Sequence, residues 1–345
     1  MMLSVEEARA AMLHAFRAPA NAERAALDDA LGSTLAEPIF APRDQPPFDV
    51  SAMDGYALRG AETPARLRIL GESAAGRPFD APLPVGAAVR ISTGARVPDG
   101  ADSVLIQEDA IVEGEWLDTP LVRPRAHVRP RAGDFAKGET LLSTGQRLDA
   151  GTLTLAAAAG RAALLVAAKP RIAILASGDE IRAPGAPIGD AQIYESASFG
   201  VAALARAWGA DVERRGIVAD DEGTLSAAAA VALSACDLLV VIGGASVGPH
   251  DHGRAALQAL GFSLHVEKVS VRPGKPTWFA TGPGGAVLGL PGNPASALVC
   301  ARLFLAPLIV KALGGAAEAA CTLKSAPLAH ALPANGPREH YVRAR

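Results

Sequence analysis

The chain has 345 residues, a formal net charge of −3 and 50% apolar residues. This length exceeds what one ordinary hydrophobic core needs, so two to four domains are expected. The weak negative charge argues against a general nucleic-acid-binding protein, because such proteins usually carry a basic face.

The N-terminal residues predict two helices. Ser4 and Glu7 have the spacing of a capping box, and apolar residues then follow at helical spacing up to Phe16. A second helix is predicted over residues 21–31, with Gly32 at its end.

A β-rich segment follows. Residues 48–140 contain short apolar stretches separated by Gly, Pro and Asp, such as 66–70, 87–92 and 103–107. Residues 141–168 return to an Ala- and Leu-rich sequence that is typical of helices. We therefore interpret the β-rich part as an insertion between two pieces of a helical domain.

From residue 170 onward, strand-like and helix-like stretches alternate. The predicted strands are 171–175, 212–218, 238–242, 263–269, 277–280 and 286–290, and the predicted helices are 196–208, 222–235, 252–260 and 295–311. This alternation predicts a doubly wound, mostly parallel sheet with helices on both faces, in which ligands bind at the carboxyl ends of the strands. The polar loops that we expect at this edge are 177–180, 219–221, 243–251 and 291–294. Residues 323–328 and 340–343 are predicted as further strand pieces.

Glycine-rich loops are the clearest sign of function. Glycine lets the backbone turn tightly, so that amide groups at the edge of a sheet can hold a phosphate. Three such loops predict a site for a phosphorylated small molecule. Besides the Pro-Gly-Lys-Pro loop at 273–276, the candidate cofactor-binding residues are Gly243, Gly244, Ser246, Gly248, Pro291, Gly292, Asn293 and Pro294.

Ser246 also lies in a G-x-S-x-G pattern, which is typical of the nucleophile of α/β-hydrolases. That motif needs a helix directly after the serine, but Pro249 and Asp251 intervene. We therefore interpret Ser246 as a phosphate-binding hydroxyl. A zinc site at His250-Asp251-His252 is disfavoured, because adjacent residues rarely chelate one ion.

Acidic residues gather at the same predicted edge. They are Asp179, Glu180, Asp220, Asp221 and Asp251. Carboxylates around a phosphate would repel it unless a cation lies between them, and Mg²⁺ prefers such oxygen ligands. The alternative is that each acid caps the following helix or closes a turn.

Three basic residues, Lys268, Arg272 and Lys275, are four and three positions apart. Their side chains could bind an oxyanion, or they could be the solvated charges of an edge strand. In the β-rich part, the acid- and aromatic-containing segment 47–57 and the loop 92–95 could form a second anion site or packed turns.

The cysteines and apolar runs predict a cytoplasmic protein. Cys236, Cys300 and Cys321 have no metal or redox spacing, and the first two lie in apolar runs typical of a core. We expect no secretory signal, because residues 1–9 are acidic and amphipathic. We also expect no membrane-spanning segment, because the longest apolar runs, 151–168 and 297–310, are interrupted by Arg161, Arg302 and Pro307.

Several of these segments together resemble the MoeA family, the molybdopterin molybdenumtransferases, to which the E domain of gephyrin belongs. The resemblance covers almost the whole chain in the same order, and its most specific motifs are Ser-Ala-Met-Asp-Gly-Tyr-Ala at 51–57 and Leu-Pro-Gly-Asn-Pro at 290–294. The other matching segments are 91–109, 177–180, 192–194, 220–221, 243–251 and 273–276.

The resemblance implies an activity and a site. The enzyme would take adenylylated molybdopterin, molybdate and Mg²⁺, release AMP and leave molybdenum on the dithiolene sulfurs. The implied catalytic residues are Asp54, Thr93, Asp134, Glu180, Asp220, Asp251, Lys268, Arg272 and Lys275, and the implied metal ligands are Glu180, Asp221 and Asp251. The family also implies a homodimer whose partner subunit completes each site, and a MogA-type adenylyltransferase as a candidate partner.

The implied architecture is an α/β multidomain protein. A helical domain of residues 1–45 and 141–169 would carry the inserted β-rich domain 46–140, followed by a MogA-like molybdopterin-binding domain at 170–315 and a truncated C-terminal β-barrel domain at 316–345. The chain departs from the family pattern at Val50 where Asn is usual, at Arg272 where Lys is usual, and at Ala132-Gly133-Asp134, where Gly-Glu-Asp is common and an acid is therefore missing.

Two other functions stay open at this point. The 170–310 module is shared with molybdopterin adenylyltransferases, which attach AMP to the pterin. A non-catalytic molybdopterin-binding or scaffold protein is the other alternative, since gephyrin clusters receptors. The sequence does not distinguish molybdate from tungstate, because both are tetrahedral oxyanions.

Overall fold

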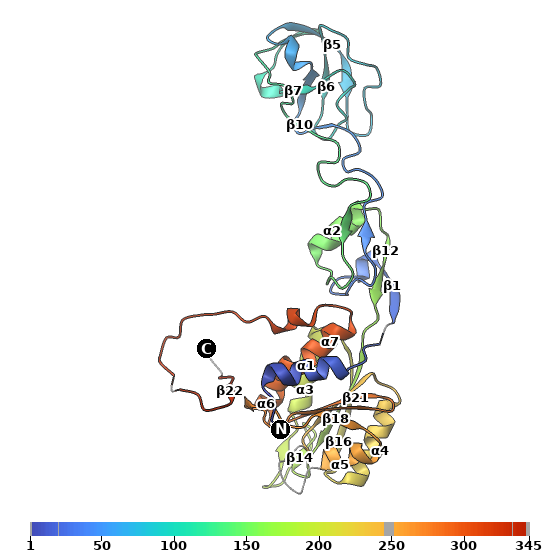
Figure 1. Ribbon diagram of the computed structural model, residues 1–345. Coiled ribbons are helices and arrows are strands. Elements are labelled where there is room, and N and C mark those ends of the chain that lie inside the picture. Colours follow the sequence, from blue (N-terminus) through green and yellow to red (C-terminus); the bar gives the residue numbers. More distant parts are fainter. Residues whose placement is uncertain (1, 20, 245–251, 333, 343–345) are drawn as a thin grey trace. The chain divides into compact units, whose positions relative to one another are not determined.

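The computed structural model describes residues 2–19, 21–244, 252–332 and 334–342 (Figure 1). The chain forms two compact units. The α/β unit comprises Met1–Glu37, Ser143–Leu153 and Ala162–Arg345, and the β unit comprises Pro38–Leu142 and Thr154–Arg161. The four-domain division and the β-barrel remnant remain predictions.

The β unit is built on a six-stranded sheet in the order β7-β4-β6-β5-β9-β8. Its strands are β4 (Gly55–Leu58), β5 (Arg66–Ser73), β6 (Ala87–Ile91), β7 (Ser103–Ile106), β8 (Ile111–Glu113) and β9 (Trp116–Asp118). Alternate residues such as Leu58, Leu67 and Leu105 form its core. Short antiparallel pairs join β3 (Val50–Ser51) to β10 (Val128–Arg129), and β2 (Ile39–Phe40) to β11 (Thr140–Leu142). The prediction of a β-rich segment over 48–140 is confirmed.

The α/β unit contains a second six-stranded sheet, in the order β16-β13-β17-β21-β20-β18. Its strands are β13 (Arg171–Ser177), β16 (Asp211–Val218), β17 (Leu238–Ile242), β18 (Ser263–Val266), β20 (Trp278–Gly282) and β21 (Gly285–Leu290). The first four strands in this order are parallel, and β20 runs antiparallel to both neighbours. All five residues of β17 are buried, as expected for a parallel strand covered on both faces.

Helices cover both faces of this sheet (Figure 1). One layer consists of α1 (Val5–Ala15), α3 (Ala197–Ala207), α6 (Pro294–Cys300), the π-helical turn η4 (Ala301–Leu305) and α7 (Ala306–Ala312), and the other of α4 (Glu222–Leu233) and α5 (His252–Ala259). Ile172 and Ile174 of β13 pack in the first layer's core, whereas Ala173 and Leu175 pack in the second. Alternate residues of a strand point to opposite faces of the sheet and therefore contribute to both cores. The predicted doubly wound, mostly parallel sheet is confirmed.

The continuous helix Pro294–Ala312 is long and apolar enough to cross a membrane by length and composition. However, 56% of its most apolar stretch is buried within the protein, and Phe304, Leu305 and Leu308 belong to the core against the sheet. We therefore interpret it as a core helix of the α/β unit.

The helix predicted over 21–31 is wrong. Residues Ala22–Ala26 form strand β1, which pairs antiparallel with β12 (Ala163–Ala167) and is followed by the 3-10 turn η1 (Leu27–Asp29). The Ala-rich sequence of β1 favours a helix locally, but pairing with the apolar β12 overrides that preference. For the same reason residues 141–168 are helical only over α2 (Ala150–Ala158).

Short elements complete the unit. They are β14 (Ile181–Arg182), β15 (Ile193–Tyr194), β19 (Val271–Arg272), η5 (Ala317–Cys321) and β22 (Glu339–His340), while the β unit adds η2 (Gly60–Glu62) and η3 (Gln107–Asp109). The two-residue β22 pairs parallel with β19. The strand predicted over 323–328 is wrong, because no strand forms there, and Lys268 lies just after β18 rather than in a strand.

Candidate active site

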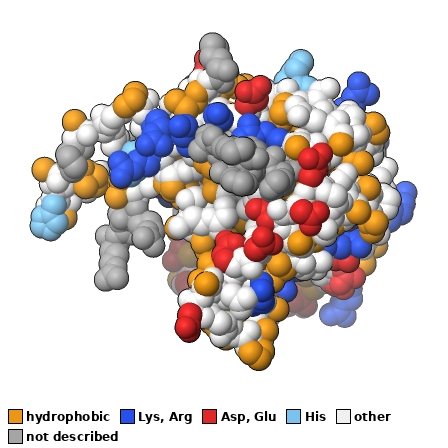
Figure 2. Space-filling view, turned by 90° about the horizontal axis from the view of Figure 1, so that it is seen from below, with side chains coloured by type: hydrophobic (Ala, Val, Ile, Leu, Met, Phe, Trp, Pro, Cys, Tyr) orange, Lys and Arg blue, Asp and Glu red, His pale blue; other side chains and the backbone are white. Residues whose placement is uncertain are grey.

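The carboxyl ends of the parallel strands bring the predicted loops together. Loops 177–180, 219–221 and 291–293 follow β13, β16 and β21, and Gly243 and Gly244 follow β17. Figure 2 views this end of the molecule and shows Asp and Glu side chains gathered close to Lys and Arg side chains. The predicted Ser246, Gly248 and Asp251 lie outside the described residues.

Glycine is required at the start of the glycine-rich loop. Gly243 has φ +86°, and a Cβ atom there would lie 2.1 Å from the carbonyl oxygen of Ser177. Its amide donates to the Leu290 carbonyl at 3.1 Å, so the loop is fixed between the ends of β13 and β21. Gly292 lies close by, because a Cβ atom on it would be 3.5 Å from the Gly243 Cα. The structure therefore brings two predicted phosphate-binding loops together.

A hydrogen-bond network joins the acids to this loop. The Ser177 hydroxyl donates to Asp220 Oδ1 at 3.0 Å, and the Asp220 amide donates to Asp179 Oδ1 at 3.3 Å. A Cβ atom on Gly244 would lie 3.4 Å from Asp220 Oδ1, so this carboxylate lies against the loop. The sequence did not single out Ser177, which is buried at the last position of β13.

Two acids differ from each other in their surroundings. Asp221 is the N-cap of α4 and accepts a hydrogen bond from the Thr224 amide at 2.8 Å, as the capping alternative expects. Glu180 is exposed, and its carboxylate has no hydrogen bond or ion pair within the described part of the chain; the residue lines a small cavity with Ser177, Glu195 and Gly292.

No group of three or more His, Cys, Asp or Glu side chains in the described part of the chain lies close enough together to hold a metal ion. The metal set Glu180, Asp221 and Asp251 therefore remains a prediction.

Helix caps shape the rest of this cavity. Asn293 caps α6 by accepting from the Ala295 and Ser296 amides at 3.1 and 3.3 Å, and Pro294 occupies the first turn. The buried Glu195 accepts from the amide and hydroxyl of Ser198, each at 2.7 Å, at the start of α3. Glu195 was not predicted from the sequence, because a glutamate before a helix matches no common capping pattern.

The three predicted basic residues have unpaired side chains. Within the described residues, Lys268, Arg272 and Lys275 make no side-chain hydrogen bond or ion pair. Their backbone is ordered by hydrogen bonds from Val269 to the Lys275 carbonyl at 3.1 Å and from Tyr341 to the Arg272 carbonyl at 2.8 Å. These cations are therefore available to bind an anion.

In the β unit, Asp54 and Thr93 form a pair. The Thr93 amide and hydroxyl both donate to Asp54 Oδ1, at 2.7 and 3.0 Å. The hydrogen bond from the Thr93 amide, and then the one from its hydroxyl, lower the pKa of Asp54 below its usual value. Both residues are exposed, and Asp54 lines a polar cavity of about 180 Å³.

The predicted Asp134 forms an ion pair with Arg129 at 2.6 Å. A second pair lies in the same unit, where Asp49 accepts from the Arg125 side chain at 2.5 Å and the Arg131 amide at 2.8 Å. Asp49 was not predicted individually, although it belongs to the segment 47–57. These contacts fix the loop around Asp134, whose role in the site remains a prediction.

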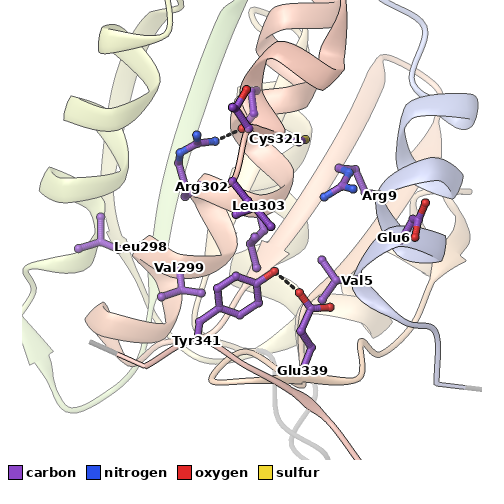
Figure 3. A pocket seen from close by; sticks show the side chains of 13 residues that line it. Val5, Glu6, Arg9, Leu298, Val299, Arg302, Leu303, Cys321, Glu339 and Tyr341 are labelled. Atoms are coloured by element: carbon purple, nitrogen blue, oxygen red, sulfur yellow. Dashed lines mark hydrogen bonds between the residues drawn. The ribbon is translucent and has the colours of Figure 1, made fainter. Parts of the chain in front are cut away.

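A larger cavity than these lies elsewhere in the α/β unit (Figure 3). It has a volume of about 650 Å³ and lies between α1 and α6, with Val5, Leu298 and Leu303 in its wall. The Tyr341 hydroxyl donates a hydrogen bond to Glu339 at one side. None of the predicted site residues lines this cavity, so the carboxyl edge of the sheet is the stronger candidate site.

Comparisons with known proteins agree with this architecture. Two family models match the chain, the MoeA N-terminal region (domain I and II) at residues 3–160 and a probable molybdopterin binding domain at 173–311. A molybdopterin molybdenumtransferase from Haemophilus influenzae is 35% identical over 317 residues, which cover 91% of this chain and 78% of that protein. A protein of the same name from Bacillus subtilis is 33% identical over 319 residues, covering 89% and 74%. The solved structure of a molybdopterin biosynthesis MoeA protein from Pyrococcus horikoshii has a TM-score of 0.79 and 32% identity, covering 91% of this chain and 81% of that one.

Proposed function

Since this chain belongs to the molybdopterin molybdenumtransferase (MoeA) family and is a transferase of molybdenum cofactor biosynthesis, we propose its reaction from that premise. The enzyme inserts molybdenum from molybdate into adenylylated molybdopterin and releases AMP, and the reaction depends on Mg²⁺. The observation that carries this proposal is the position of Asp220, whose carboxylate lies against Gly244 at the carboxyl edge of the sheet. A carboxylate beside an amide-lined turn suits a phosphate that is bridged to the protein by a cation.

The residues at this edge have separate roles in the proposal. The amides around Gly243 and Gly292 bind the phosphate of the pterin, while Asp220, held by Ser177, orients the phosphoanhydride. The unpaired cations Lys268, Arg272 and Lys275 bind the molybdate oxyanion.

Magnesium fits the donors present. Mg²⁺ is usually held by one or two carboxylates together with substrate phosphates, so it does not need a preformed cluster of three acids. The exposed, unpaired carboxylate of Glu180 would be its first ligand, with Asp221 and Asp251 as further candidates. When bound, Mg²⁺ would stabilise the negative charge that develops on the leaving AMP.

The β unit contributes Asp54, Thr93 and Asp134. Family resemblance supports a homodimeric cytoplasmic enzyme in which this unit completes the site of the partner subunit. It also supports a MogA-type adenylyltransferase as the supplier of the adenylylated substrate.

The test is AMP release from adenylylated molybdopterin with molybdate and Mg²⁺. We expect AMP and the molybdenum-containing cofactor to form together, and both to stop when EDTA removes Mg²⁺. Glu180→Gln should raise the Mg²⁺ concentration needed for half-maximal activity, whereas Glu213→Gln, near the opposite end of β16, should not.

Parallel reactions distinguish the other two functions. AMP attachment to molybdopterin from ATP would indicate an adenylyltransferase, and tight pterin binding without turnover would indicate a carrier. Either result, with no AMP release above the blank, would contradict the proposal. Replacing molybdate by tungstate measures the preference for the oxyanion.

A further inference from the structure

Arg90 occupies a distinctive place on the sheet of the β unit. In the register of β4, β6 and β5, it lies between Tyr56 on one side and Glu72 on the other. Asp54 lies in the bend directly before β4, two positions before Tyr56. Arg90, Tyr56, Glu72 and Asp54 all line the polar cavity of about 180 Å³.

The charges in this cavity are unbalanced without Arg90. Its lining includes two carboxylates, Asp54 and Glu72. Within Pro38–Leu142, all of which the structure describes, Arg90 is the only Lys or Arg that lines it. Two carboxylates in one cavity repel each other, and a cation between them offsets that repulsion.

The Arg90 guanidinium also has no ion-pair partner among the described residues. Other arginines of the β unit form ion pairs, such as Arg68 with Glu115 at 3.1 Å and Arg96 with Asp99 at 3.0 Å. Arg90 has neither a side-chain hydrogen bond nor an ion pair with a described residue. Its charge therefore acts on the cavity rather than on a structural partner.

One oxygen of the Asp54 carboxylate, Oδ2, accepts no hydrogen bond from a described residue. Thr93 donates both of its hydrogen bonds to Oδ1, and no described residue donates to Oδ2. The amide and hydroxyl of Thr93 are the larger causes of the lowered pKa of Asp54, and the charge of Arg90 lowers it further.

We propose that Arg90 is a positioning residue for Asp54 in the transfer reaction. Its guanidinium shares the cavity with the Asp54 and Glu72 carboxylates, and its charge offsets their repulsion and favours the ionised Asp54 carboxylate with its free oxygen facing the substrate. This inference rests on the proposed function, in which Asp54 belongs to the active site.

The other groups near Asp54 cannot replace this charge. Tyr56 and Gln107 line the cavity but supply no positive charge, and the Thr93 hydroxyl is already bound to Oδ1. The turn η3 adds Glu108 and Asp109, which are acidic and do not line the cavity.

The test compares Arg90→Gln and Arg90→Lys with the control Arg68→Gln, an exposed arginine on β5. We expect Arg90→Gln to lower kcat about tenfold with little change in KM, since small misplacements of a reacting group are costly. The acid limb of its pH profile of kcat should move to higher pH.

The control variants show whether the charge is the cause. Arg90→Lys should restore most of the lost kcat and of the shifted pH profile, and Arg68→Gln should match the wild type. An Arg90→Gln profile that superimposes on the wild-type profile would overturn the inference, and so would a loss of kcat that Arg90→Lys fails to restore.

A measurement without turnover separates this inference from the proposed function. NMR titration of ¹³C-labelled aspartate carboxyls, with the Asp54 signal identified from Asp54→Asn, reports the pKa of Asp54 directly. We expect Arg90→Gln to raise it and Arg68→Gln to leave it unchanged. A raised pKa in a protein without transferase activity would contradict the proposed function alone. An unchanged pKa in an active enzyme would contradict the role of Arg90 alone.

Discussion

The Ser177 hydroxyl donates a hydrogen bond of 3.0 Å to Asp220 Oδ1, although 43 residues separate them in the chain. This bond joins the ends of the adjacent parallel strands β13 and β16. It holds the carboxylate against Gly244, at the start of the glycine-rich loop. A pairing of neighbouring strands thus positions a candidate catalytic side chain.

Ser177→Ala tests the importance of this bond. We expect stability to fall by about 1–2 kcal/mol, because Asp220 loses a charge-assisted hydrogen bond in a part-buried position. AMP release should fall several-fold as the carboxylate becomes less ordered. Ser234→Ala removes an exposed hydroxyl bonded to the Val231 carbonyl and is the control, with little effect expected on either property. Urea unfolding and the AMP assay give both values, and unchanged values for Ser177→Ala would contradict this role.

Asp221 variants separate a helix cap from a metal ligand. Asp221→Ala should destabilise the protein by about 1 kcal/mol, because the Thr224 amide loses its acceptor. Asp221→Asn keeps an oxygen acceptor and should retain stability. If Asp221 also binds Mg²⁺, the Asn variant will need more Mg²⁺ for activity while its melting temperature is unchanged. Equal destabilisation by Ala and Asn would contradict the capping role.

The Asp54 and Thr93 pair predicts a pH dependence. The pKa of Asp54 in the folded protein is lowered, first by the Thr93 amide and then by its hydroxyl. Activity that needs the carboxylate should therefore persist below the usual aspartate pKa and be lost as the pH falls through the lowered value.

Two variants test this dependence. Thr93→Val keeps the amide but removes the hydroxyl, so the acid limb of kcat should move to higher pH. Asp54→Asn should lower kcat at least about 100-fold at neutral pH without changing the melting temperature, since Asp54 is exposed. An Asn variant with wild-type activity would remove Asp54 from the site.

Gly243→Ala should be more damaging than a substitution at another glycine with positive φ. Its Cβ would meet the Ser177 carbonyl oxygen at 2.1 Å, whereas Gly216 has φ +93° and nothing within 4 Å of its Cβ position. Gly216→Ala should cost about 1–2 kcal/mol from backbone conformation alone. Gly243→Ala should cost more and reduce substrate binding, because the loop must move. Calorimetric unfolding of both variants measures the difference, and equal losses would contradict the close approach at Gly243.

The three thiols should differ in reactivity. Cys300 is fully buried and burial raises its pKa to about 11, and burial also raises the pKa of Cys236. Cys321 is partly exposed. At pH 8 a disulfide reagent should therefore modify one thiol rapidly in the native protein and all three in urea. Cys321→Ser should abolish the rapid phase, and a remaining rapid phase would contradict the burial of Cys236 and Cys300.

The α/β unit was the most predictable part of the fold. The run Leu238–Ile242 is apolar throughout, so both its type and its bounds could be predicted from the sequence. Strand β1 could not, because its residues favour a helix and its conformation depends on pairing with β12, more than 130 positions later. The same limit applies to the short pairings of β2 and β22, which depend on distant backbone partners.

The candidate site was predictable in its location more than in its contacts. Parallel strands end at one edge, which predicted the loops around Gly243, Asp220 and Gly292. The contributions of Ser177 and Glu195 needed the structure, because a hydroxyl or a carboxylate at a strand or helix end has no sequence pattern of its own beyond capping. Asp221, by contrast, was predicted as a metal ligand, but in the structure its carboxylate caps the N-terminus of α4.

A crystal structure of the protein with adenylylated molybdopterin and Mg²⁺ tests the central claim most directly. We expect the phosphate groups to lie at the carboxyl edge of the parallel strands, within hydrogen-bonding distance of the amides around Gly243 and Gly292 and beside Glu180 and Asp220. A pterin bound in the cavity between α1 and α6, with this edge empty, would contradict the account.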